Sequence, residues 1–227
     1  MKKNLVILSG AGMSAESGIP TFRDMGGIWE KYDVTEVASP QAWVKNPQLV
    51  LDFYNQRRKK LLESYPNRGH QIIAELEKYF NVQIVTQNVD DLHERAGSSN
   101  ILHLHGELRK VRSTSHPELV YELKGWELKL GDLCEKGSQL RPHIVWFGES
   151  VDNIGIAMQI VQTADILVVV GTSLNVYPAA GLVQFAPQNA QIYVIDPEKP
   201  LITARNKIVF ITEKASIGLE KFKEMVL

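Results

Sequence analysis

Two histidines close together have the clearest potential for acid–base chemistry. They lie in residues 103–107, which read His-Leu-His-Gly-Glu and follow a short apolar run. An imidazole has an unperturbed pKa near ~6.5, so His105 can accept and return a proton near neutral pH as a general base. For a lone histidine the alternative is a structural role. We assign His103 a packing or supporting role, and the structural role applies to His70, His93, His116 and His143.

Residues 86–97 bring neutral amides and carboxylates together after another apolar run. Gln87, Asn88 and Asp90 can hydrogen-bond the hydroxyls of a ribose and a carboxamide. A strand-to-helix cap is the alternative, because Asn and Asp are favoured N-cap residues. Both roles can hold together, since a capping loop is also a binding loop.

A glycine-rich segment, residues 10–23, directly follows the apolar run 5–8. A strand that breaks into such a turn is typical of dinucleotide sites in α/β proteins, where glycines let backbone N–H groups approach a pyrophosphate. A helix beginning near Ala15 would aim its positive end at the same phosphates. The spacing departs from G-x-G-x-x-G, and no strand ending in an acidic residue follows about twenty residues later. The segment therefore disfavours a hydride-transfer dehydrogenase.

Buried strands are needed to position these groups. Several of the β-rich apolar runs are continuous rather than alternating, which is typical of strands covered on both faces. Helical patterns lie between them, so we predict a doubly wound parallel sheet. The expected strands are 5–8, 82–86, 101–104, 166–170, 192–195 and 208–211, and the expected helices are 48–64, 67–79, 90–96, 154–163, 179–185 and 215–225.

The composition argues against a strong overall electric field. The chain has 227 residues, 25 Lys and Arg against 26 Asp and Glu, and a formal charge of -1. We therefore expect neither nucleic acid nor a membrane as a partner. The first apolar run is too short for a secretory signal, and no stretch approaches the ~20 residues of a membrane span. We expect a cytoplasmic protein.

Four motifs, in the same order and across nearly the whole chain, resemble the sirtuin family of NAD-dependent protein deacylases, in its bacterial type. They are residues 10–23, residues 86–107, the Pro-His-Ile-Val-Trp-Phe-Gly-Glu of 142–149 and the Gly-Thr-Ser of 171–173. The resemblance implies one catalytic unit over 1–227 with a Rossmann-like core, about 1–25, 64–107 and 142–227. Two insertions, about 26–63 and 108–141, would form a small domain, with the substrate in the cleft between the two parts.

The resemblance also implies roles around bound NAD. His105 would be the general base that activates a ribose hydroxyl, and Asn88 would act beside it. Arg23 would pair with a phosphate or position the nicotinamide ribose, and Phe22 would shield the reacting face from water. The NAD-binding residues implied are Gly10, Ala11, Gly12, Ala15, Glu16, Thr21, Phe22, Arg23, Trp29, Gln87, Asn88, Asp90, His105, Gly171, Thr172, Ser173, Asp196, Glu198 and Ala215.

One NAD position departs from the family pattern. Asp196 stands where the family often has Asn, and a carboxylate can accept from ribose hydroxyls but cannot donate. We therefore expect the hydrogen bonds at this position to differ from those of the family.

Substrate choice would depend on Tyr54 and Arg57, which are three apart and share a helix face. This Tyr-x-x-Arg pair resembles the signature of sirtuins that remove succinyl and malonyl groups, because a guanidinium can bind a distal carboxylate bidentately. The alternative is a solvated basic face, since Arg58, Lys59 and Lys60 follow. An extended acyl-lysine peptide would pair with the segment containing Val145, Phe147 and Gly148.

The single cysteine, Cys134, excludes the four-thiolate zinc site that many sirtuins carry. Zinc is therefore expected to be absent, because the stretch where the family places its cysteine pairs has Ser113, Ser115, His116 and Cys134. A mixed Cys/His zinc site is the alternative. The insertion would then depend on apolar packing by Leu119, Tyr121, Leu123, Trp126, Leu128, Leu130 and Leu133.

The activity implied is NAD-dependent removal of acetyl and of succinyl or malonyl groups from protein lysines, which yields nicotinamide, O-acyl-ADP-ribose and free lysine. Two alternatives would use the same NAD pocket. They are a protein ADP-ribosyltransferase and a noncatalytic module that binds NAD or ADP-ribose.

Overall fold

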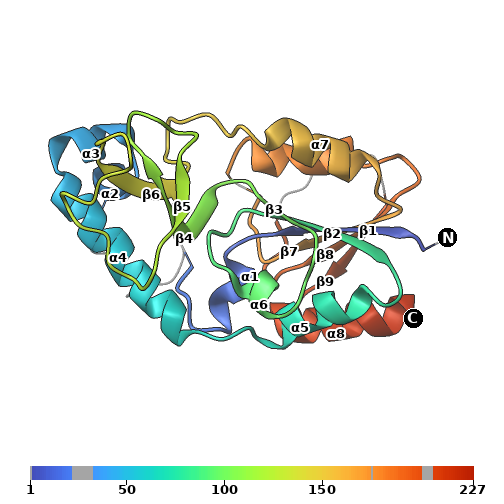
Figure 1. Cartoon of the computed structure of the whole chain (residues 1–227). Coiled ribbons are helices and arrows are strands. Elements are labelled where there is room, and N and C mark those ends of the chain that lie inside the picture. Colours follow the sequence, from blue (N-terminus) through green and yellow to red (C-terminus); the bar gives the residue numbers. More distant parts are fainter. Residues whose placement is uncertain (1, 22–32, 175, 201–206) are drawn as a thin grey trace.

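The computed structural model describes residues 2–21, 33–174, 176–200 and 207–227, and its largest element is a six-stranded sheet (Figure 1). All of its strand pairs are parallel, in the order β3-β2-β1-β7-β8-β9. The strands are β1 (Asn4–Ser9), β2 (Asn81–Thr86), β3 (Ile101–His103), β7 (Ile166–Val170), β8 (Gln191–Ile195) and β9 (Ile208–Ile211). The six strands expected from the apolar runs are therefore confirmed.

The strand register brings the candidate motifs to one edge of this sheet. Ser9 pairs with Thr86 on β2 and with Val170 on β7, so these three strands end level with one another. The chain order of the strands changes direction between β1 and β7, and such a switch point opens a crevice at the carboxyl ends of the strands. The loops after β1, β2 and β7 therefore meet at one edge of the sheet.

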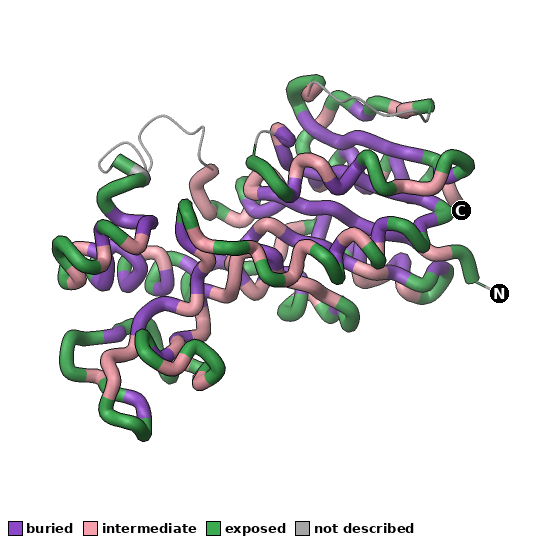
Figure 2. The backbone as a smooth tube through the Cα atoms, turned by 90° about the horizontal axis from the view of Figure 1, so that it is seen from above, coloured by how far each residue is buried: buried purple, intermediate pink, exposed green. Residues whose placement is uncertain are grey.

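Helices cover both faces of the sheet. Helices α5 (Arg68–Leu76) and α8 (Ala215–Val226) lie against one face, while α7 (Ile154–Gln162) and the 3-10 helix η2 (Ala179–Phe185) lie against the other (Figure 1). The central strands are consequently buried along their length (Figure 2). This double burial explains why their sequences are apolar without alternation.

A smaller part of the molecule is built from the two insertions. Strands β4 (Gly106–Ser113), β5 (Val120–Glu122) and β6 (Leu140–Ile144) form an antiparallel sheet in the order β5-β4-β6. Helices α2 (Val34–Val37), α3 (Pro40–Lys45) and α4 (Pro47–Glu63) lie beside it at the left of Figure 1. The predicted fold class, a doubly wound α/β core with a small domain, is confirmed.

Buried polar groups tie α4 to this small sheet. Asn55 Nδ2 donates to Leu128 O, and Leu128 N donates back to Asn55 Oδ1. Arg58 is fully buried and donates from Nε to Leu108 O and from Nη1 to Trp126 O. Arg58 thus does not belong to a solvated basic face, because its guanidinium links the helix to two segments of the insertion.

Apolar packing in the insertion is sparser than the sequence suggests. Leu128 is buried beside Leu51 and Val111, and Tyr121 and Leu123 pack against that cluster. Three of the expected core side chains remain exposed, namely Trp126, Leu130 and Leu133. The polar contacts of Asn55 and Arg58 supplement this small apolar cluster.

Two local predictions differ from the structure. The helix expected to begin near Ala15 instead ends there, because α1 covers only Gly12–Ala15. Segment 179–185 forms the 3-10 helix η2. Helix α6 is also short and spans Leu92–Arg95.

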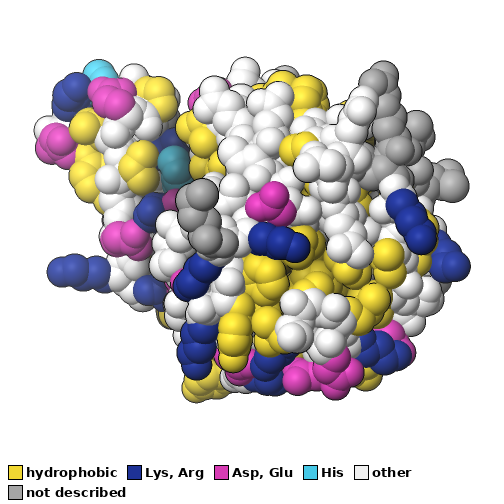
Figure 3. Space-filling view, turned by 90° about the vertical axis from the view of Figure 1, so that its right-hand side faces the viewer, with side chains coloured by type: hydrophobic (Ala, Val, Ile, Leu, Met, Phe, Trp, Pro, Cys, Tyr) yellow, Lys and Arg dark blue, Asp and Glu magenta, His cyan; other side chains and the backbone are white. Residues whose placement is uncertain are grey.

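The outer surface mixes both signs of charge. On the face drawn in Figure 3, lysine and arginine side chains lie among aspartates and glutamates around a band of hydrophobic groups. Within the described ranges, no helix combines the length and apolarity needed to cross a membrane.

Candidate active site

The glycines after β1 and β7 let two loops touch. A Cβ on Gly10 would lie 2.6 Å from the Thr172 Cβ, and one on Gly12 would lie 2.8 Å from the Gly171 Cα. Gly10 N donates to Val170 O and Gly12 N to Gly171 O. These glycines are therefore required for close contact between the loops, and their N–H groups serve the fold rather than a phosphate.

A hydroxyl joins the loop after β1 to the loop after β2. Ser14 Oγ donates to Asp90 Oδ2 at 2.9 Å and accepts from Asn88 Nδ2 at 3.2 Å. Burial raises the pKa of Asp90, although hydrogen bonds from Ser14 and from Leu92 N oppose that effect. Ser14 is absent from the residues expected at the site. Its polarity is visible in the glycine-rich motif, but nothing in the sequence distinguishes it from the neighbouring Ser17.

A contact with the loop after β2 orients His105 as a base. Its Nδ1 lies 3.1 Å from Gln87 O, which can only accept, so Nδ1 carries the proton and Nε2 keeps its lone pair. Burial lowers the pKa of His105, and the bond to Gln87 opposes this only partly. The neutral form able to take a proton is therefore favoured at neutral pH. Gln87 Nε2 in turn donates to Thr172 Oγ1, which links the loop to β7.

The other residues expected to bind NAD follow the ends of β1, β7, β8 and β9. Asp196 is buried after β8, and its Oδ1 accepts from Glu198 N. Glu16 accepts from Ser216 N beside Ala215, where α8 begins. Ala11, Ala15, Thr21 and Ser173 lie in the same loops, whereas Phe22, Arg23 and Trp29 fall outside the described residues.

The predicted acyl clamp lies on α4. Tyr54 is buried, and its hydroxyl accepts from Trp146 Nε1 at 3.1 Å. The guanidinium carbon of Arg57 lies 5.6 Å from the ring centroid of Phe53 and 5.7 Å from that of Tyr54. Burial lowers the pKa of Arg57, while negative charge on Tyr54 and Asp90 would oppose this shift. Tyr54 and Arg57 are thus neighbours, and Asp90 is near enough to influence the guanidinium.

The segment after β6 is held by its own chain. Val145 N donates to His105 O, and Phe147 N donates to Ala38 O. The Phe147 side chain is half exposed, and Gly148 is exposed with a φ of 92°. The N–H groups of Val145 and Phe147 are already engaged, so a peptide would have to pair with other backbone groups of this segment.

Glu149 stabilises the same segment. Its Oε2 accepts from Trp146 N at 2.8 Å, and its carboxylate also accepts from both terminal nitrogens of Arg141. The Arg141 guanidinium lies over the Trp146 ring at 3.3 Å from the centroid. Trp146 is therefore a buried anchor between the segment and Tyr54.

A profile of the Sir2 family matches residues 10–178, which covers the loops after β1, β2 and β7. This chain belongs to the Sir2 family. Its curated relatives include the NAD-dependent protein deacylase of Bacteroides thetaiotaomicron, 56% identical over 99% of this chain and 98% of the relative. Another relative of the same name, from Helicobacter pylori, is 60% identical over 94% of this chain and 93% of the relative.

Solved Sir2 structures share the fold. A Sir2 homologue in complex with NAD has a TM-score of 0.87 and is 43% identical, with 99% of this chain and 90% of that chain covered. A Sir2 mutant with a deacetylated p53 peptide and 3′-O-acetyl ADP-ribose has a TM-score of 0.84 and is 27% identical, over 99% of this chain and 94% of that one. The Rossmann-like fold of the Sir2 homologues is therefore the fold of this chain.

Cys134 and His116 contact neighbouring side chains of the small domain. Cys134 is buried and its Sγ contacts Ser113 Oγ at 3.4 Å, whereas His116 lies 3.6 Å from Glu118. In the part of the chain that is described, no group of three or more His, Cys, Asp and Glu side chains is arranged to hold a metal ion.

Proposed function

We propose that this Sir2 protein is an NAD-dependent protein-lysine deacylase that removes acetyl groups and also succinyl or malonyl groups. The products would be nicotinamide, O-acyl-ADP-ribose and free lysine. The observation that carries the proposal is the orientation of His105, whose Nε2 keeps its lone pair because Nδ1 faces Gln87 O. The family and the deacylase names of relatives support the same reaction.

The loops at the sheet edge can bind the parts of NAD that react. NAD supplies a leaving nicotinamide and a ribose that takes up the acyl group. Asn88 and Asp90, held by Ser14, offer an amide and a carboxylate to nicotinamide and ribose. His105 would take a proton from a ribose hydroxyl at Nε2 and return it later, as a general base does. Thr172 and Asp196 would contact the adenosine end.

The clamp on α4 supports a preference for acidic acyl groups. An indole N–H can only donate, so the Trp146 contact makes the Tyr54 oxygen the acceptor. The Tyr54 proton is then available for a ligand carboxylate, and burial raises the pKa of Tyr54, which keeps that proton in place. Arg57 would supply the positive charge. A succinyl carboxylate would gain charge-assisted bonds that an acetyl group cannot form.

Mass spectrometry of matched acetyl-lysine and succinyl-lysine peptides, with and without NAD, tests the proposal. We expect NAD-dependent loss of both groups, with succinyl lost faster. Arg57→Met should slow desuccinylation roughly tenfold or more, as expected for a lost charge-assisted bond, and should slow deacetylation much less. Lys59→Met, an exposed change on the same helix, is the matched control.

The other outcomes contradict distinct parts of the proposal. Faster loss of acetyl than of succinyl, or equal effects of Arg57→Met on both peptides, would exclude the clamp. Either result would still be consistent with a deacylase. Nicotinamide release with mass added to a target protein would indicate ADP-ribosyl transfer. Nucleotide binding with neither acyl loss nor nicotinamide release would indicate a noncatalytic module.

We also propose that the small domain functions without zinc. The single thiol lies against Ser113, and the contacts of Asn55 and Arg58 join α4 to the insertion where the family often uses cysteines. Metal analysis of purified protein would contradict this proposal if it found one zinc per chain.

A further inference from the structure

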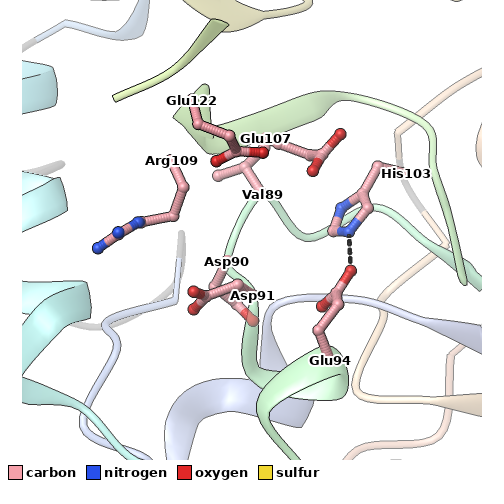
Figure 4. Close-up of a pocket in the computed structure, with 8 residues that line it drawn as sticks. All are labelled: Val89, Asp90, Asp91, Glu94, His103, Glu107, Arg109 and Glu122. Carbon is pink, nitrogen blue, oxygen red and sulfur yellow. Dashed lines mark hydrogen bonds and ion pairs between the residues drawn. The ribbon is translucent and has the colours of Figure 1, made fainter. Parts of the chain in front are cut away.

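A second histidine, His103, also contacts the loop after β2, but at a different backbone carbonyl from the one that His105 contacts. His103 ends β3, and its Nδ1 lies 3.0 Å from Asn88 O. Its Nε2 lies 2.8 Å from Glu94 Oε1 on α6, and its side chain is only 9% exposed (Figure 4). The ring therefore bridges the loop after β2 and the helix that follows this loop.

The two histidines hold consecutive peptide groups. His105 contacts Gln87 O at 3.1 Å, and His103 contacts the next carbonyl, Asn88 O. The backbone of His103 is itself fixed, because Asn153 Nδ2 donates to its carbonyl at 3.0 Å. A shift of the Asn88 peptide would move the Asn88 side chain and also the Gln87 carbonyl that orients His105.

The partners of His103 require both ring nitrogens to donate. A carbonyl oxygen and a carboxylate oxygen are acceptors, so both bonds form only when the ring is the imidazolium. Burial lowers the pKa of His103, but the hydrogen bond and charge of Glu94 outweigh this effect, and the pKa lies above its usual value. Burial likewise raises the pKa of Glu94, but the bond to His103 outweighs it and the net shift is downward.

The surroundings of the pair are mostly acidic. A pocket of about 240 Å³ opens beside it, and the loop and α6 contribute Asp90, Asp91 and Glu94 to its wall. The small sheet adds Glu107 and Arg109 from β4 and Glu122 from β5 (Figure 4). Glu107 favours the charged ring, and the buried His93 lies near enough for the His103 charge to lower the His93 pKa. The pocket gives the pair access to water and protons.

We propose that Glu94 and His103 are a positioning pair for the deacylation reaction. Glu94 keeps His103 in its doubly donating form, and His103 holds the Asn88 peptide and thereby aligns Asn88 and His105. The proposal rests on the proposed function for its kinetic effect. Because the proton of His103 is present below its raised pKa and lost above it, the alignment weakens as pH rises.

Rate–pH profiles of purified full-length variants test the pair. Glu94→Gln lets neutral His103 keep both bonds, since its Nδ1 donates to Asn88 O and its Nε2 accepts from the amide. We therefore expect wild type to show a decline in kcat as pH rises above ~6.5, the ordinary pKa of histidine, and Glu94→Gln to lose this decline. Glu94→Ala should lower kcat about tenfold, with a smaller change in KM for NAD, as expected for one lost charge-assisted bond.

A matched control is available in the small domain. Glu118→Gln makes the same change in another His–Glu pair, with His116 Nδ1 3.6 Å from Glu118, and should leave the profile as in wild type. Identical profiles for wild type and Glu94→Gln would overturn the proposal. So would a kcat of Glu94→Ala close to that of wild type.

Hydrogen–deuterium exchange of residues 87–91 gives a readout that needs no catalysis. After correction for intrinsic exchange, protection in wild type should fall as pH rises, while protection in Glu94→Gln should stay level. If wild type removes no acyl group, the proposed function fails, but the exchange result still decides whether the pair holds the loop. Equal pH dependence in both proteins would overturn the positioning role.

Discussion

The edge of the large sheet and the proposed acyl clamp, Tyr54 and Arg57 on α4, are built by different means. At the sheet edge, strand register sets Ser9, Thr86 and Val170 level, and the loops that follow meet through backbone contacts. At the clamp, Trp146 from a distant segment donates to Tyr54, and Arg58 on the same helix as Tyr54 and Arg57 donates to Leu108 O of the small sheet. Strand pairing aligns the first region before side chains such as Ser14 and His103 join its loops, whereas buried polar side chains are the main contacts that position the second.

This difference predicts how each region responds to substitution. A side chain at the sheet edge can be removed with loss of chemistry but little loss of structure, because the backbone ladder remains. A buried polar side chain in the small domain cannot be removed in this way, because its former partners stay buried without a hydrogen bond. Four substitutions or treatments test this difference between the two regions.

The largest expected effect is chemical. His105→Ala should lower kcat by about 10² to 10⁴, the usual contribution of a general base, while leaving the free energy of unfolding nearly unchanged. In wild type, the lowered pKa of His105 means that its basic form is lost only as pH falls below ~6.5, so the acid limb of kcat/KM should lie there. Steady-state kinetics and urea denaturation measure both effects. Retained activity in the folded variant would refute the base assignment.

The next effect is structural. Arg58→Ala should lower the free energy of unfolding by about 3 kcal/mol, because the buried Leu108 carbonyl and the part-buried Trp126 carbonyl lose a donor and a cavity forms. Lys59→Ala, on the exposed side of α4, is the matched control and should change stability by less than about 0.5 kcal/mol. Urea denaturation compares the two variants. Equal stabilities would show that the small domain does not depend on the Arg58 contacts.

A smaller effect should be specific to acidic substrates. Trp146→Phe removes the indole N–H that orients Tyr54 but keeps an aromatic ring in the core. We expect KM for a succinyl peptide to rise about fivefold, as for one hydrogen bond, and KM for an acetyl peptide to change less. Trp43→Phe, whose ring centroid lies 5.8 Å from that of Trp146, is the control. Equal changes on both peptides would argue that Trp146 acts only by packing.

The smallest expected effect is that of metal removal. If the small domain functions without zinc, as proposed, dialysis against a strong chelator should leave the unfolding midpoint and the deacylation rate unchanged, because the contacts of Asn55 and Arg58 remain. Thermal unfolding before and after dialysis measures this. A lower midpoint that zinc restores would show that a metal, and not only buried side chains, holds the small domain.

Much of the core could be predicted from the sequence. A short continuous apolar run such as 166–170 predicts a strand that is buried on both faces. The structure confirms this prediction, because the run forms β7. The expected helix near Ala15 was wrong because the chain turns immediately after β1 and helix α1 ends at that residue. Local patterns therefore identify elements well but place their ends less well.

The contacts that orient the side chains of the site could not be predicted from the sequence. Ser14 and Asp90 are 76 residues apart, and Tyr54 and Trp146 are 92 apart, so neither pairing has a local signal. Arg58 reads as part of a basic surface because two lysines follow it, yet it is buried. The role of His103 depends on Glu94, which only the path of α6 brings to its ring.

The sequence by itself determined the parallel α/β core, the order of its motifs and the chemical types at the ends of its strands. These follow from local hydrophobic periodicity and from residue chemistry, which need no knowledge of the fold. Only the tertiary structure decided which nitrogen of His105 faces Gln87 and which hydroxyl joins Asn88 to Asp90. Hydrogen bonds are directional and short, so these choices exist only once distant segments have been packed together.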